Sequence, residues 1–166
     1  VAALKAGREP DLMAPMAAAT DINLHSPALL PDDYCGDVHL RLSFYKKLAT
    51  AKTTSQLDTI VEELVDRFGK LPPSASNLID VHRLRLLCAD YGVVKLDAAP
   101  TVILISFKAQ APVDPAAIIR LIQTHRDIKL AGNDRLRIEK SLPDIKARVQ
   151  AVRDIFRNLG KPTTPV

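Results

Sequence analysis

One short stretch of the chain carries the side-chain types that bind zinc. Cysteine, histidine and aspartate occur together there, at Asp32, Asp33, Cys35, Asp37 and His39. A structural zinc site needs four well-placed ligands, which usually come from closely spaced Cys-Cys or His-His pairs. The stretch has one cysteine and one histidine, and the second cysteine of the chain, Cys88, is far away. We therefore interpret it as a turn whose aspartates accept hydrogen bonds from backbone amides.

No other pattern in the sequence points to catalysis. The six glycines are too widely spaced to form a phosphate-binding loop, which excludes a dinucleotide fingerprint and a P-loop. Ser43 and Ser106 lack the sequence context of a nucleophile elbow. We expect no active site, no metal and no bound cofactor in this chain.

One predicted helix carries an unusual concentration of acid. Asp58, Glu62 and Asp66 repeat every four residues, with Glu63 beside them and Arg67 as the single base. Four acids and one base give this face a charge of −3, whereas the chain as a whole carries +4. Like charges four residues apart cost a few tenths of a kcal/mol per pair, and an anion in the last helical turn costs ~0.3–1 kcal/mol. Such a face suits a basic protein partner and repels nucleic acid; a solvated face without a partner is the alternative.

The basic residues support a competing hypothesis of DNA contact. They occur on the third and last predicted helices, at Arg83, Arg85, Lys146, Arg148, Arg153 and Arg157. Aromatic residues make up only 4% of the chain, which argues against binding of single strands by base stacking. An accessory DNA-binding module that uses the basic face of the last helix therefore remains the alternative function.

Three helices are predicted in the first half of the chain. Asp37 can cap the first, whose apolar stripe contains Val38, Leu42, Tyr45, Leu48 and Ala49. Residues 53–56 (TTSQ) predict a capping box before the second, whose stripe contains Leu57, Ile60, Val61, Leu64, Val65 and Phe68. Gly69 can take the left-handed conformation that ends this helix. The third, from about 74 to 91, is apolar on most sides and is expected to lie centrally.

The second half of the chain predicts two β-hairpins. Residues 93–96 and 101–107 are β-branched runs on either side of a turn. Residues 128–130 and 135–139 alternate between apolar and charged side chains around a glycine-containing turn, which indicates one face open to water. A short extended piece is also expected at 22–24, ahead of the first helix.

These elements together define an α+β fold. Its expected order is three N-terminal helices, then β-hairpins with a short helix between them, and a long C-terminal helix. Asp114 is expected to cap the short helix, and Ser141 the last one.

The domain organisation is predicted from composition. Residues 1–20 are expected to be a tail, 21–160 the folded domain and 161–166 a disordered tail. Hydrophobic residues make up 47% of the chain, and no run of them reaches the length of a membrane span. We expect a cytoplasmic protein with two free thiols.

Several segments resemble the C-terminal domain of bacterial transcription-repair coupling factors, the TRCF family. The first are residues 22–24 (INL), 30–34 (LPDDY) and 37–46 (DVHLRLSFYK). A further segment is residues 63–72 (ELVDRFGKLP). These segments follow one another in the same order and at a similar spacing as in the family. The resemblance extends over roughly residues 21–159, and the preceding tail is similar to the end of a helicase region.

The resemblance implies a regulatory role without chemistry of its own. The full-length factors are ATP-dependent double-stranded DNA translocases that release stalled RNA polymerase and recruit the excision-repair protein UvrA. Their C-terminal domain is expected to clamp onto an N-terminal UvrB-like region, cover the UvrA-binding surface and restrain the motor. ATP and magnesium are expected in the motor of the parent protein, outside this chain.

The resemblance also implies which residues make the interdomain contact. The family uses charged residues of the Glu-Leu-x-Asp-Arg stretch, which here are Glu63, Asp66 and Arg67. Glu62 is added as a neighbour on the acidic face.

Overall fold

The computed structural model describes residues 20–163, which build two hydrophobic cores on a shared helix, α4 (Pro73–Tyr91). The first half of α4 contributes Leu78 and Ile79 to a helical core, and the second half contributes Leu84 and Cys88 to the core beneath a sheet. This confirms the central place predicted for the third helix. The predicted tails lie largely outside the described residues, so the domain boundaries stay predictions.

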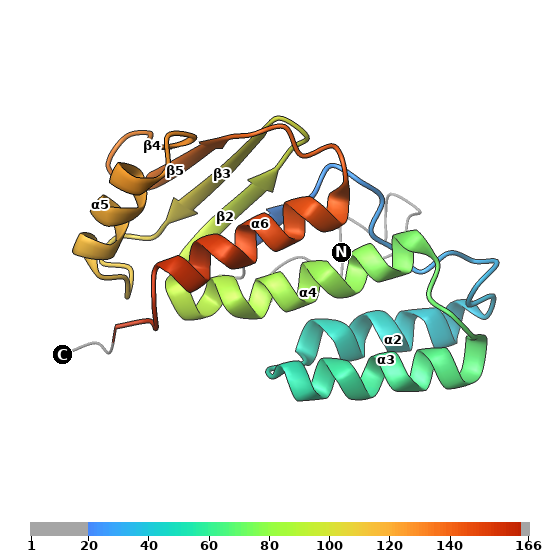
Figure 1. Ribbon diagram of the computed structural model, residues 1–166. Helices are drawn as coiled ribbons and strands as arrows, with labels where there is room; N and C mark the ends of the chain where they lie inside the picture. Colours follow the sequence, from blue (N-terminus) through green and yellow to red (C-terminus); the bar gives the residue numbers. More distant parts are fainter. Residues whose placement is uncertain (1–19, 164–166) are drawn as a thin grey trace, which may run out of the picture.

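The helical half consists of α2 (Val38–Thr50) and α3 (Thr54–Phe68), which pack against α4 (Figure 1). As predicted, the Asp37 carboxylate accepts a hydrogen bond from the backbone amide of His39, at 2.9 Å. Gly69 ends α3 with φ 87° and ψ −166°, a backbone conformation that favours glycine. Its φ is positive as expected, but its ψ lies outside the left-handed helical region.

Half of the predicted capping box forms at the start of α3. The Thr53 hydroxyl accepts a hydrogen bond from the Gln56 amide at 3.1 Å. The Gln56 side chain instead accepts from the amide of Lys52 at 2.7 Å, one residue earlier than a capping box requires. Both interactions satisfy backbone donors at the helix start, so the predicted beginning of α3 holds.

The predicted apolar stripes wrongly include two residues that are exposed. Val38 is 45% exposed and Val65 is 41% exposed, whereas Phe44 is only 1% exposed. In α2, the buried stripe is turned toward Phe44, whose ring packs edge-on against Phe68 with centroids 6.1 Å apart. In α3, Val65 lies ~100° around the helix from the fully buried Leu64, which turns it away from the core.

The sheet half joins the predicted strands into one sheet with the order β1-β2-β3-β5-β4. The strands are β1 (Asp21–Asn23), β2 (Val93–Ala98), β3 (Val102–Phe107), β4 (Ile128–Leu130) and β5 (Arg135–Glu139). Both predicted hairpins are present as β2–β3 and β4–β5, and the antiparallel β3–β5 pair connects them. The extended piece expected at 22–24 is the edge strand β1, parallel to β2. The α+β class and the order of helices and hairpins are therefore confirmed.

Helices α4 and α6 (Ile145–Asn158) lie side by side on one face of this sheet (Figure 1). The short helix α5 (Pro115–Thr124) lies at one end of the sheet. Asp114 caps α5 as predicted. Asp144 caps α6, so the prediction of Ser141 is wrong. The reason is that Leu142 donates a hydrogen bond to the Pro100 carbonyl at 2.6 Å, which keeps this segment extended along the β2–β3 turn.

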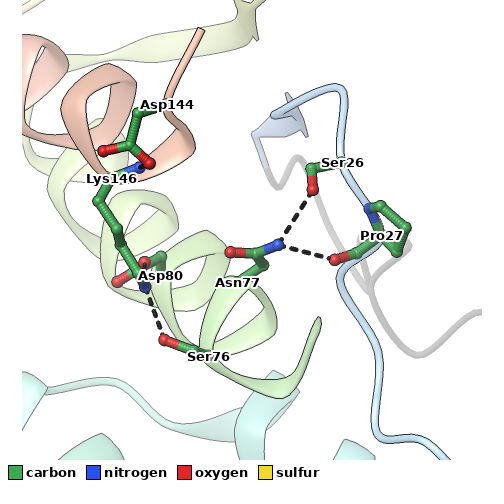
Figure 2. A network of polar contacts seen from close by, with 7 residues as sticks. All are labelled: Ser26, Pro27, Ser76, Asn77, Asp80, Asp144 and Lys146. Carbon is green, nitrogen blue, oxygen red and sulfur yellow. Dashed lines mark hydrogen bonds and ion pairs between the residues drawn. The ribbon is translucent and has the colours of Figure 1, made fainter. Parts of the chain in front are cut away.

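Polar contacts hold the two halves together around the start of α4. Asn77 is 4% exposed and donates to the hydroxyl of Ser26 at 3.2 Å and the carbonyl of Pro27 at 3.0 Å, which fixes the segment after β1 (Figure 2). Lys146 of α6 lies 2.6 Å from the carboxylate of Asp80. Among residues 20–163, no helix has the length and apolar character needed to cross a membrane.

Candidate protein-interaction surface on helix α3

Helix α3 places the four predicted interface residues on one exposed surface. Leu57, Ile60 and Leu64 face the core, so the opposite side of the helix points to solvent. Glu62, Asp66 and Arg67 are exposed, and Glu63 is half-buried. Figure 1 shows α3 along the side of the molecule that is remote from the sheet. The predicted acidic face is therefore accessible to another protein.

On the side facing α2, Glu63 is shared by two bases. The ammonium of Lys47 lies 3.1 Å from one of its carboxylate oxygens, and the guanidinium of Arg67 lies 3.6 Å from the other. The Lys47 ammonium also lies 5.0 Å from the centroid of the Phe44 ring, within the range of a cation–π interaction. This group of one acid and two bases has a net charge of +1.

Of the other three acids of α3, Glu62 and Asp66 remain available. The third, Asp58, forms an ion pair with Arg83 of α4 at 2.7 Å. Within residues 20–163, the carboxylates of Glu62 and Asp66 make no hydrogen bond or ion pair, and the exposed Val65 lies between them in the sequence. Two unpaired acids beside an exposed aliphatic side chain can contact a basic and partly apolar protein surface.

The structure shows that sequence patterns missed two members of this surface. Val65 follows the apolar period of α3, and only the direction of the core reveals that it is exposed. Lys47 is sixteen residues from Glu63 in sequence and belongs to another helix. The opposite charges of the two helices were the available signal, but the pairing of α2 with α3 was not predicted from the residues.

The central base of the last helix is part of the core. Arg148 is 4% exposed and donates to three backbone carbonyls: those of Leu142 and Leu24, each at 2.7 Å, and that of Pro143, at 2.8 Å. A guanidinium presents five donors in a fixed fork, which suits such a multiple contact. Arg148 therefore cannot reach a DNA phosphate in this fold.

The other basic candidates except Arg153 are also engaged within the chain; Arg153 makes no hydrogen bond or ion pair among the described residues. Arg85 donates to the carbonyls of Leu48 and Ala51 at the end of α2, at 3.0 and 3.1 Å. Arg157 pairs with Asp154 at 3.3 Å on the surface of α6. These contacts leave the last helix with less available positive charge than its sequence indicates.

The stretch of potential metal ligands forms a turn and a helix start. Cys35 is fully buried, and this burial raises the pKa of its thiol. Asp37 is used as the cap of α2, and His39 points to solvent at its first turn. In the part of the chain that the structure describes, no three side chains of metal-ligating type lie close enough to hold an ion.

Two cavities lie in the sheet half, away from α3. One of about 360 Å³ lies between α6 and the β4–β5 strands, and one of about 580 Å³ lies beside the start of α5. Neither is lined by residues of α2 or α3. The acidic face is therefore separate from these concave sites.

Comparison with known proteins identifies relatives over nearly the whole chain. The model of the TRCF domain matches residues 24–118. Transcription-repair-coupling factors of Haemophilus influenzae and Escherichia coli are 44% and 42% identical, and each match covers 96% of this chain and 14% of the relative. The factor of Buchnera aphidicola is 32% identical over 85% of this chain and 18% of its own length. The chain thus spans about one seventh of the length of the first two relatives.

A solved structure shares the fold. The crystal structure of the C-terminal domain of a transcription-repair coupling factor superposes with a TM-score of 0.68. The match covers 85% of this chain and 94% of that one, at 18% sequence identity. This likeness extends over both the helical and the sheet half, and the family match adds the relationship in sequence. The chain belongs to the TRCF domain family, the C-terminal domain of transcription-repair coupling factors.

Proposed function

We propose that this domain is a regulatory protein-interaction module of a transcription-repair coupling factor. It clamps onto the N-terminal UvrB-like region of the same protein and masks the surface that binds UvrA. The clamp also restrains the ATP-dependent DNA translocase of the parent protein. Release of the clamp exposes the UvrA-binding surface and frees the motor.

The observation that carries this proposal is the exposed acidic face of α3. Glu62 and Asp66 lack partners within the described residues, and Val65 beside them is 41% exposed. Glu63 and Arg67 complete a mixed-charge surface on the same helix. Charges at the edge of an interface set partner choice and orientation more than affinity, which suits a contact that must open again.

DNA contact through the last helix has less support. Arg148 is buried against backbone carbonyls, and Lys146 is paired with Asp80. The acids of α3 disfavour an approach by phosphate groups from the helical side.

The remaining steps of the pathway belong to other parts of the parent protein. We place ATP and magnesium binding, double-stranded DNA and RNA polymerase contact in domains outside this chain, and UvrA recruitment in the UvrB-like region. The proposed location is the cytoplasm, where the free, buried thiols of Cys35 and Cys88 stay reduced.

Deletion tests the proposal at the level of the domain. Residues 21–166 are removed from the intact factor, and UvrA capture and basal ATPase rate are measured beside the wild type. We expect both to rise, because the mask and the restraint are lost together. Unchanged UvrA capture and unchanged ATPase would sink the clamp.

Substitution tests the proposal at the level of the surface. The triple variant Glu63→Ala/Asp66→Ala/Arg67→Ala in the intact factor is expected to raise UvrA capture toward the level of the deletion. The control is Asp33→Asn, which neutralises one exposed acid outside α3 and so changes the net charge by +1, as the triple variant does. If the control raises capture as much as the triple variant does, then total charge and not the α3 surface governs the clamp.

A further inference from the structure

The helical hairpin carries opposite charges on its two helices. Helix α2 contains Arg41, Lys46 and Lys47 and no acid, which gives +3. Helix α3 contains four acids and Arg67, which gives −3. Among the described residues, the ion pair between Lys47 and Glu63 is the contact that bridges these two charged surfaces.

The fold holds Lys47 in this position. Its ammonium lies 5.0 Å from the ring centroid of Phe44, which is fixed in the core at 1% exposure and packs against Phe68. The same ammonium lies within 3.1 and 3.4 Å of the two carboxylate oxygens of Glu63. The neighbouring Lys46 is exposed and makes no side-chain ion pair within residues 20–163. Two adjacent lysines of α2 thus differ in their relation to the acidic face.

We propose that Lys47 lowers the affinity of the α3 surface for its partner by holding Glu63 while the domain is undocked. On docking, Glu63 exchanges Lys47 for a cation of a basic protein partner, and Lys47 turns to solvent. This inference rests on the proposed function, since it concerns the same surface. It makes Glu62 and Asp66 the acids that meet the partner first, and Glu63 the acid whose contribution Lys47 limits.

The exchange is physically easy because every group is partly solvated. The side chains of Lys47, Glu63 and Arg67 are 45%, 37% and 49% exposed. An ion pair at such exposure changes an equilibrium by a factor of about two to five. Removing the lysine charge also removes its repulsion of the partner's cations, so both effects favour docking.

The test uses the factor that lacks residues 21–166, with the present chain added back in trans. The concentration of the chain that half-suppresses UvrA capture measures its affinity for the rest of the factor. Lys47→Met is expected to lower this concentration about two- to fivefold. Lys47→Arg, which keeps the charge and the reach toward Glu63, is expected to behave like the wild type.

Two controls separate the specific contact from total charge. Lys46→Met removes the same charge one residue away, without freeing Glu63, and is expected to give a smaller gain than Lys47→Met. In a Glu63→Gln background, Lys47→Met is expected to give no more gain than Lys46→Met does. Circular dichroism melts confirm that each variant is folded before it is compared.

Each outcome has a definite meaning. A gain by Lys47→Met that exceeds that of Lys46→Met and disappears with Glu63→Gln supports the exchange. Equal gains from both lysines, or a loss with Lys47→Met, overturn the role of Lys47 and leave the clamp intact. If the wild-type chain does not suppress UvrA capture at all, the proposed function fails, and this inference fails with it.

Discussion

The two halves of the domain use charged residues in opposite ways. In the helical half, the carboxylates of Glu62 and Asp66 lie in water without partners among the described residues. In the sheet half, the guanidinium of Arg148 is buried and donates to three carbonyls. A buried charge must be fully hydrogen-bonded, because its desolvation costs several kcal/mol. The contrast shows that the buried Arg148 maintains the fold of the sheet half, whereas Glu62 and Asp66 on α3 remain available for binding.

The largest effect is expected from breaking the buried contact. Arg148→Met removes the donors to the carbonyls of Leu24, Leu142 and Pro143, and we expect a loss of roughly 3–5 kcal/mol in the free energy of unfolding. Urea denaturation followed by circular dichroism measures this loss. The matched control is Arg153→Met on the same helix, where Arg153 is half-buried, with an expected loss below about 1 kcal/mol. If both variants lose the same free energy of unfolding, then the buried contacts of Arg148 do not stabilise the sheet half more than an ordinary surface residue does.

The second effect sharpens the distinction between core and surface within α3. Leu64→Ala deletes a fully buried side chain and is expected to cost about 2–5 kcal/mol, because it leaves a cavity in the helical core. Val65→Ala is expected to cost less than about 1 kcal/mol, since Val65 is 41% exposed. The same denaturation experiment compares them. A large cost for Val65→Ala would show that this residue supports packing and is not part of an available surface.

The third effect lies where the two halves meet on α4. His82 is fully buried, and burial together with the nearby Arg85 charge lowers its pKa to about 3. Its Nδ1 accepts a hydrogen bond from Arg85, and its Nε2 has no partner within the described residues. Between its ordinary pKa of 6.5 and about 3, the unfolded chain binds a proton that the folded one does not. Stability should therefore fall as the pH drops through this window.

A substitution isolates this contribution from those of the carboxylates. From pH 7 to pH 4, His82 is expected to account for roughly 3 kcal/mol of lost stability, at about 1.4 kcal/mol per pH unit. His82→Leu should reduce the loss by that amount, as measured by urea denaturation at both pH values. The prediction is wrong if the wild type and His82→Leu lose equal stability over this range.

The smallest effect on stability is expected at the acidic face. Glu62→Gln/Asp66→Asn should leave the free energy of unfolding unchanged or raise it by a few tenths of a kcal/mol, because it relieves like-charge repulsion and an anion in the last turn of α3. The same variant should weaken suppression of UvrA capture in the trans assay. A loss of stability above about 1 kcal/mol would mean that the two acids support the fold.

The sequence alone determined the order and type of the elements. Asp37 and Asp114 predicted the starts of α2 and α5, and Pro73 fits the first turn of α4. The acidic face was also evident from spacing, since residues four apart share one side of a helix. These features depend on contacts a few residues long, so local chemistry is enough to predict them.

Only the tertiary structure decided which charges are available and how the strands join. The β3–β5 pair unites two hairpins that the sequence left separate, and Arg148 contacts the Leu24 carbonyl, 124 residues away. The pairing of Lys47 with Glu63 depends on how α2 packs against α3. Such contacts arise from the packing of distant segments around a common core. Whether such a contact forms depends on the free energy of burial and of desolvation in the folded core, and the spacing of residues in the sequence does not give either quantity.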